Sequence, residues 1–258
     1  MLNKNHTARS FSKAAALYDR KALWQKDVAQ YLLQFVPPQF SNALDLGCGT
    51  GTLALNLQKI NPAAEIHGID IAEGMIYEAL KRSIKEKSPE VLFNIGDMEH
   101  IPYPDESFDL VVSNLSLQWL DEPNRCFAEV QRVLRPEGRF IFTTLIDGSM
   151  PELQEAYAAI QHTHSHPLIS AERIKEALNA AGLIIFGLEM FTDTLYFKTF
   201  PELLESIRGI GAKAQNTQPL TKTKLQKLTQ AYAHETKGYP VSYDVILCTA
   251  LKIAVGYN

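Results

Sequence analysis

A run of three alternating glycines constrains the fold of this chain more than any other feature of its sequence. Gly47, Gly49 and Gly51 follow the short apolar run at residues 42–46, and a helical pattern begins at Thr52. Glycines at these positions let the backbone turn sharply and approach a ligand with no side chain in the way. The pattern predicts the first strand, loop and helix of a doubly wound α/β fold.

Acidic residues around this loop indicate a nucleoside cofactor. Asp70 ends a second predicted strand, where a carboxylate can accept hydrogen bonds from a ribose. Asp97 follows a third strand and can accept from an exocyclic adenine amine, with Ile71 and Met98 against the ring faces. Asp45 precedes the loop and suits an ammonium or sulfonium group better than a pyrophosphate.

The glycine loop, the acids that end the strands and the strand at residues 108–114 together resemble the class I S-adenosylmethionine-dependent methyltransferases. The resemblance covers residues 41–145 and implies S-adenosyl-L-methionine as cofactor, with S-adenosyl-L-homocysteine as its product. The alternative is that these are turn glycines and acids of an unrelated α/β domain. The expected cofactor contacts are Gln25, Asp45, Gly47, Cys48, Gly49, Gly51, Asp70, Ile71, Met75, Asp97, Met98 and Asn114.

Strand and helix patterns alternate along the chain, which predicts a mostly parallel, seven-stranded, doubly wound sheet of the Rossmann-like type. Strands are expected near residues 42–46, 65–70, 91–95, 108–113, 139–145, 184–190 and 242–251. Helices are expected at 12–35, 52–59, 73–87, 124–134 and 171–181, with a turn at 136–138. We divide the chain into N-terminal lid helices (1–40) and a methyltransferase domain (41–258) with helical insertions at about 147–170 and 200–235.

The first predicted helix presents a stripe of mostly apolar residues. Phe11, Ala15, Tyr18, Ala22, Gln25 and Ala29 recur at spacings of three and four and share one face. The helix either packs on the body of the protein with Tyr18 in the core, or forms a lid across the cofactor cleft. In the second case Tyr18 and Gln25 face the methionine part of the cofactor or the acceptor.

Two further segments are candidates for contact with the acceptor. Gln118 and Trp119 follow the fourth strand at a position expected to be exposed, and we interpret them as a pocket wall in preference to core. His162, His164 and His166 alternate, but no carboxylate or cysteine nearby completes a metal set, so no metal is expected. His164 remains a candidate substrate contact.

Segments outside the glycine loop resemble a narrower family, the malonyl-acyl-carrier-protein O-methyltransferases of biotin synthesis. They are residues 11–19 with Gln25, 113–119, 142–145, 148–153, and 207–212 with 239–240 and Tyr243. The chain departs from the family at 164–168, where it reads His-Ser-His-Pro-Leu in place of His-x-Asn-x-Phe. The resemblance implies methylation of the free carboxylate of malonyl-acyl carrier protein, giving the methyl ester that starts the pimeloyl chain of biotin.

The implied reaction requires no general base, because a carboxylate with a pKa of about 4 is already ionised at neutral pH. Catalysis would then consist mainly of alignment in a cleft that excludes water. Arg208 is the candidate cation for the malonyl carboxylate, or else a surface arginine that contacts the carrier protein. The expected substrate residues are Tyr18, Gln118, Trp119, His164 and Arg208.

Basic residues are concentrated in two segments of a chain whose net charge is −4. Residues 1–26 hold six Lys or Arg and one acid, and residues 198–227 hold six and two. The segments either recognise an acidic partner such as the carrier protein or are solvated helix faces. A polar N-terminus and the lack of a long apolar run predict a cytoplasmic protein that does not contact membranes.

Two other functions stay open at this point. A methyltransferase acting on a quinone or another apolar small molecule would need a base and would not need a basic rim. A nucleoside-binding module without catalytic activity would bind cofactor without turnover. Nucleic acid is not expected as a partner, because the isoelectric point is about 6.0.

Overall fold

Seven strands form one sheet in the computed structural model, which describes residues 3–120, 122–161, 168–209, 221–232 and 238–253. Their order is β3-β2-β1-β4-β5-β7-β6; β7 runs antiparallel to both of its neighbours, β5 and β6, and the other neighbouring pairs are parallel. The doubly wound, mostly parallel sheet predicted from the sequence is therefore confirmed. The strands are β1 Asn42–Leu46, β2 Glu65–Asp70, β3 Leu92–Ile95, β4 Phe108–Asn114, β5 Leu134–Leu145, β6 Leu183–Phe197 and β7 Tyr239–Lys252.

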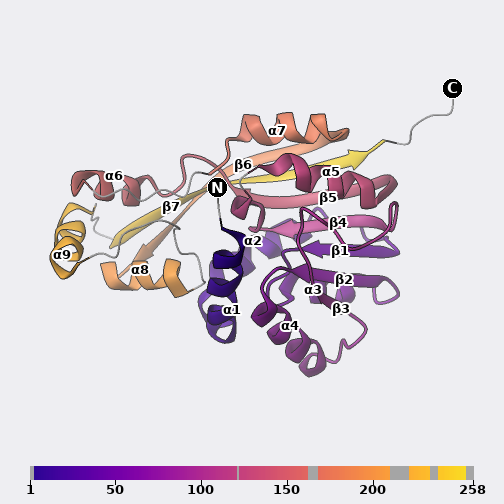
Figure 1. Cartoon of the computed structure of the whole chain (residues 1–258), viewed down its shortest axis with the longest axis horizontal. Coiled ribbons are helices and arrows are strands. Elements are labelled where there is room, and N and C mark those ends of the chain that lie inside the picture. The colour runs from indigo at the N-terminus through magenta and orange to yellow at the C-terminus, as the bar shows by residue number, and fades with distance from the viewer. Residues whose placement is uncertain (1–2, 121, 162–167, 210–220, 233–237, 254–258) are drawn as a thin grey trace.

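Helices cover both faces of the sheet (Figure 1). Those before β1 and in the crossovers are α1 Lys4–Lys21, α2 Leu23–Leu33, α3 Thr52–Ile60, α4 Glu73–Lys85, α5 Pro123–Val133 and α7 Ala171–Ala180. The others are α6 Pro151–Ala159, α8 Phe200–Gly209 and α9 Lys222–Ala231, and a short 3-10 turn spans Leu117–Trp119. The expected insertions at 147–170 and 200–235 thus contain α6, and α8 with α9, respectively.

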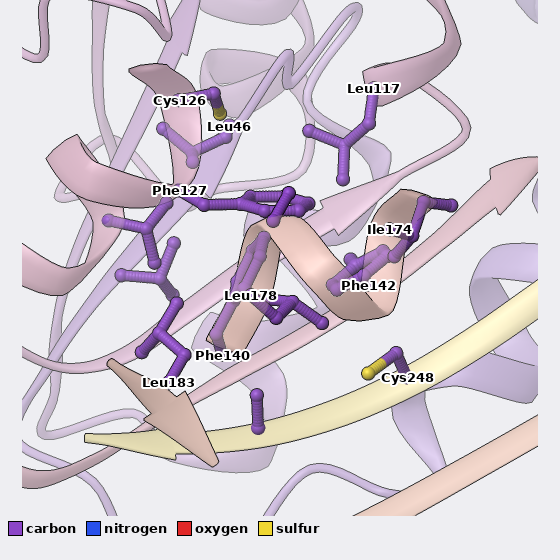
Figure 2. Close-up of a cluster of buried hydrophobic side chains, with 14 of the residues drawn as sticks. Leu46, Leu117, Cys126, Phe127, Phe140, Phe142, Ile174, Leu178, Leu183 and Cys248 are labelled. Carbon is purple, nitrogen blue, oxygen red and sulfur yellow. The ribbon is translucent and has the colours of Figure 1, made fainter. Parts of the chain in front are cut away.

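Alternate residues of the central strands bury against opposite faces, as the two-residue period of a strand requires. On β4, Val111 belongs to the core under α5 and α7, whereas Leu110 and Val112 belong to the core under α2, α3 and α4. Figure 2 shows the first of these cores, where Phe127 of α5 packs on β5. Its ring centroid lies 5.8 Å from that of Phe140 and 5.7 Å from that of Phe142.

The N-terminal helix differs from its prediction. The single helix expected at 12–35 is two helices, which begin earlier and break at Ala22 (φ −86°, ψ 42°). The two helices pack on different elements: α1 contacts α4, whereas α2 buries Val28, Ala29 and Leu32 against the sheet and α3. The break lets the chain change direction between these two surfaces.

Two strands are also longer than predicted. β5 begins at Leu134 and includes the expected turn as a bulge, since Phe108 pairs with Leu134 but Leu110 pairs with Arg139. β6 continues to Phe197 and stays paired with β7 far beyond the last β5–β7 pair, Leu145 with Val245. The outer parts of β6 and β7 therefore form a two-stranded arm, visible on the left of Figure 1 with α6, α8 and α9 around it.

Candidate functional site

Two adjoining cavities lie at the carboxyl ends of β1 and β4, beneath α1. They contain about 750 Å³ and 410 Å³ of empty space, part of it open to solvent, and they share Tyr18, Gly47, Gly49 and Asn114 as lining residues. This edge is where the strand order of a doubly wound sheet reverses direction, and ligands of such folds bind there. We call the larger space the first cavity and the smaller one the second cavity.

The glycine loop forms the floor common to both cavities. Gly47 has φ +67°, and a Cβ there would lie 2.5 Å from the Cβ of Ser116. Gly49 has φ +54°, and a Cβ there would meet no atom within 4 Å, so it would project into open space. Gly51 lies outside both cavities, at the start of α3. The loop therefore needs glycine for its backbone at Gly47 and for ligand space at Gly49.

Asp70 braces this loop and lines the first cavity. One carboxylate oxygen accepts from the Gly49 N–H at 3.0 Å, and the other accepts from the Ala72 N–H at 2.8 Å. Burial raises the pKa of Asp70 to about 6, although both backbone hydrogen bonds act in the opposite direction. At neutral pH the group is mostly an ionised acceptor held by the loop itself.

Asp45 lines the second cavity and is almost fully buried. Its Oδ2 accepts from the Ala54 N–H of α3 at 3.1 Å. Burial raises the pKa of Asp45 to about 8, the Ala54 hydrogen bond acts against this shift, and the charge of Asp70 adds to it. A cation placed beside Asp45 would favour its ionised form.

Asp97 lies at the far end of the first cavity, where Lys4 of α1 pairs with it. The Lys4 ammonium donates to Asp97 Oδ2 at 2.6 Å and also contacts Glu99, while Asp97 Oδ1 accepts from the Glu99 N–H at 3.0 Å. Burial opposes ionisation of Asp97, but the hydrogen bonds from Lys4 and from the Glu99 N–H and the positive charge of Lys4 together outweigh it, so the pKa of Asp97 lies below its usual value. This pair was not predicted from the sequence.

Two further hydrogen bonds hold α1 across the cleft. Ser12 Oγ accepts from the Gly74 N–H of α4 at 3.2 Å, and the Thr50 hydroxyl of the glycine loop donates to Asp19 Oδ1 at 2.7 Å. Between them Tyr18 lines both cavities, and burial raises the pKa of its phenol, which stays neutral. Through these two hydrogen bonds, α1 is attached directly to the glycine loop and to α4.

The two residues expected to form a pocket wall, Gln118 and Trp119, lie in different environments. Trp119 lines the first cavity and packs edge to face on Phe11 of α1, with ring centroids 5.2 Å apart. Gln118 is not exposed as predicted: its amide donates to the Leu115 carbonyl at 2.8 Å and accepts from the Thr144 hydroxyl at 3.0 Å. The turn at Leu117–Trp119 thus places Trp119 at the first cavity and Gln118 in the protein interior.

Most of the predicted site residues line the cavities. They are Tyr18, Gln25, Asp45, Gly47, Cys48, Gly49, Asp70, Ile71, Met75, Asp97, Met98, Asn114 and Trp119. Gln118 and Arg208 line neither cavity, Arg208 being exposed on α8, and His164 lies outside the described residues. The lining residues that the sequence did not single out include Lys4, Thr7, Lys26, Thr50, Ser116 and Leu120.

Comparison with known proteins identifies the chain. A family model described as a methyltransferase domain matches residues 40–182. The malonyl-[acyl-carrier protein] O-methyltransferase of Hahella chejuensis is 34% identical over 98% of this chain and 92% of that protein. The chain belongs to this family of methyltransferases. The biotin biosynthesis bifunctional protein BioHC of Saccharophagus degradans is 33% identical over 97% of this methyltransferase but 47% of that protein, so the chain spans about half of that relative.

Solved structures support the fold of the methyltransferase. The YcgJ protein from Bacillus subtilis superposes with a TM-score of 0.65 at 19% identity, covering 88% of this chain and 98% of that one. At such low identity the likeness concerns the fold alone. None of the described helices of the methyltransferase is long and apolar enough to cross a membrane.

The cofactor of the methyltransferase is S-adenosyl-L-methionine, and the cavities fit it. The open space over Gly49 joins a first cavity with carboxylates at Asp70 and Asp97 to a second cavity with a buried carboxyl at Asp45. A nucleoside carries hydroxyl and amine donors, and the methionine part carries an ammonium. The donors of the cofactor and the acceptors of the site therefore match.

Proposed function

We propose that this methyltransferase transfers a methyl group to the free carboxylate of a malonyl thioester on acyl carrier protein, forming the methyl ester that starts the pimeloyl chain of biotin. The similarity to the Hahella chejuensis protein over nearly the full length of both chains carries this proposal. The arm and its helices contribute to the match, because the methyltransferase domain model ends at residue 182.

The first cavity is proposed to take the adenosine part of the cofactor. Asp70 accepts from the ribose, and Asp97 accepts from the adenine amine. Ile71 and Met98 lie against the faces of the ring. When bound, S-adenosyl-L-methionine supplies an electrophilic methyl group on a sulfonium. Gln25 of α2 and Asp45 line the second cavity, which takes the methionine part.

The helices of residues 1–40 are proposed to act as a lid over this site. The hydrogen bonds of Lys4, Ser12 and Asp19 to the body of the protein support this role. The aromatic contact between Phe11 and Trp119 closes the cavity with apolar surface. A malonyl carboxylate is already ionised, so the residues need only align it and exclude water from it.

The titratable groups of the first cavity support a reaction without a general base. They are Lys4, Tyr18, Asp70 and Asp97. Lys4 and Asp97 pair with each other, Tyr18 keeps its proton, and Asp70 accepts from two backbone N–H groups. A methyltransferase for an apolar carbon acceptor would need one of these groups as a free base.

The carrier protein is proposed to dock on the basic residues of α1 and α8, which contact each other. Arg9, Lys13 and Arg20 of α1 and Arg208 of α8 are exposed. Because Arg208 lines neither cavity, its position favours contact with an acidic carrier over contact with the malonyl carboxylate.

The deciding experiment measures transfer of a radiolabelled methyl group to malonyl-acyl carrier protein, malonyl-coenzyme A and free malonate. We expect the carrier-bound thioester to be the best acceptor, with a single-turnover rate that, when S-adenosyl-L-methionine is saturating, shows no ionisation between about pH 6 and about pH 8. Transfer to a quinone-type acceptor, or a steep rise in rate over this range, would refute the proposal. Cofactor binding without transfer to any acceptor would favour a binding module.

Docking is tested with Arg208→Ala, and with Arg125→Ala on α5 as a control at an exposed arginine elsewhere. We expect Arg208→Ala to slow transfer to the carrier-bound substrate only, with the loss disappearing at high salt. If Arg208→Ala slows transfer to malonyl-coenzyme A by the same factor, Arg208 instead binds the malonyl carboxylate.

A further inference from the structure

The second cavity contains one acid and one base that can be charged at neutral pH. Its titratable lining residues are Tyr18, Lys26, Asp45 and Cys48. Burial raises the pKa of the Tyr18 phenol and of the Cys48 thiol, so both stay neutral. Lys26 and Asp45 therefore set the charge of this space.

Lys26 lies on the first turns of α2, just after the helix break at Ala22. Its ammonium donates to the main-chain carbonyl of Asp19 at 2.7 Å and forms an ion pair with the Asp19 carboxylate, whose Oδ1 lies 3.6 Å away, too far for a hydrogen bond. An ammonium has three N–H donors. The carbonyl fixes the end of the side chain at the cavity wall while leaving donors for another acceptor.

The cofactor's methionine part is a zwitterion with an α-ammonium and an α-carboxylate. A carboxylate removed from water is costly unless it is paired. Asp45 suits the ammonium, since it is the acid of this cavity. We propose that Lys26 pairs with the α-carboxylate of the cofactor and so fixes the methionine end within the second cavity.

The start of α3 supports an anion in the same space. Thr52 and Leu53, its first two residues, line the second cavity, and the N-cap residue Gly51 has no side chain to cap the helix. The positive end of a helix favours a negative group nearby. The Ala54 N–H of this turn already donates to Asp45. Lys26 is therefore the charged group that is left to pair with the cofactor carboxylate.

The helix break gives Lys26 this position. A continuous helix through Ala22 would place residues 19 and 26 nearly two turns apart along one axis. In the structure the Lys26 ammonium reaches back to the Asp19 carbonyl, and Asp19 in turn accepts from Thr50 of the glycine loop. The lid, α2 and the loop thus meet at the proposed carboxylate site.

Calorimetry of cofactor-product analogues tests the proposal without any acceptor, so its outcome is independent of the proposed reaction. The variants are Lys26→Met and Lys26→Arg, with Lys59→Met on α3 as a control at an exposed lysine. The ligands are S-adenosyl-L-homocysteine, its decarboxylated analogue, which keeps the amine, and 5′-methylthioadenosine, which lacks both groups.

We expect Lys26→Met to weaken S-adenosyl-L-homocysteine binding by about 10- to 100-fold, as for a lost charged hydrogen bond. Binding of the two ligands that lack the carboxylate should change by less than about 2-fold. Lys26→Arg should recover much of the loss, and Lys59→Met should have no effect. Equal weakening of all three ligands, or unchanged binding of S-adenosyl-L-homocysteine, would overturn the proposal.

Discussion

Replacing Asp45 with asparagine should make the protein's stability less dependent on pH. The carboxyl is almost fully buried, and its pKa rises from 3.8 to about 8 on folding. Between these values the folded state keeps a proton that the unfolded state has lost, so unfolding becomes easier as pH rises. The stability that Asp45 contributes is complete below pH 3.8 and is lost as pH rises through about 8.

The magnitude follows from the size of this shift. Each pH unit within the window removes about 1.4 kcal/mol, so the full effect is up to about 6 kcal/mol. In Asp45→Asn the amide oxygen can still accept from the Ala54 N–H, and the titration is absent. We expect the free energy of unfolding of the wild type, relative to the variant, to fall by about 1–1.4 kcal/mol per unit from about pH 5 to about pH 8.

Urea unfolding of both proteins without cofactor, at several pH values in this range, measures the difference. Subtracting the free energy of unfolding of the variant from that of the wild type removes the contribution of the groups that titrate in both proteins. A difference that stays constant across the range would show that Asp45 is ionised in the folded protein. The environment assigned to the end of β1 would then be wrong.

Three further predictions concern the cofactor cavities. Asp70→Ala should weaken S-adenosyl-L-methionine binding by about 1–3 kcal/mol, because ribose hydroxyls lose their acceptor; unchanged affinity in calorimetry would refute the placement of the ribose. Gly49→Ala and Gly182→Ala should each cost about 1 kcal/mol in thermal unfolding, since both glycines have positive φ and open space at Cβ. Only Gly49→Ala should lower cofactor affinity, by about 10-fold or more, and equal affinities would contradict its place in the cavity floor. Cofactor binding near neutral pH should release protons in wild type and fewer in Asp45→Asn, measured by calorimetry in buffers of different ionisation enthalpy; equal release would exclude Asp45 as the group that ionises.

The residues that line the cavities around the glycine loop could be predicted because their signals are local. Gly47 and Gly49 follow one strand, and Asp70 and Asp97 follow two others, so the parallel sheet brings them to one edge. Strand order and glycine spacing can be predicted without knowledge of contacts between residues far apart in the sequence. Trp119 lines the first cavity, as its place after β4 predicted, and Tyr18 lines both cavities, which is one of the two positions that helix periodicity left open.

Other features depend on contacts that the sequence does not reveal. Gln118 is buried because Thr144 of β5 and the Leu115 carbonyl satisfy its amide, and neither partner is evident from the local pattern. The break at Ala22 occurs in a residue with the highest intrinsic helix propensity, so packing on two different surfaces overrides that propensity. The sequence pattern identified Lys4 and Lys26 only as members of a basic segment, although each lines a cavity in the structure.

The two-stranded arm has its own hydrophobic cluster, separate from the two cores that flank the parallel strands. Leu153 of α6, Phe200 of α8, Leu228 of α9 and Val241 of β7 belong to it, and Trp24 joins it from α2 by stacking on Tyr243, with ring centroids 4.4 Å apart. The cluster meets the first cavity at Leu115, which belongs to both. Because packing defects act mainly on their immediate neighbours, we expect substitutions far from Leu115 in the arm to have little effect on the glycine loop and its carboxylates. A separate cluster of this kind allows the sequence of the arm to vary while the packing around the proposed methyl-donor site is retained.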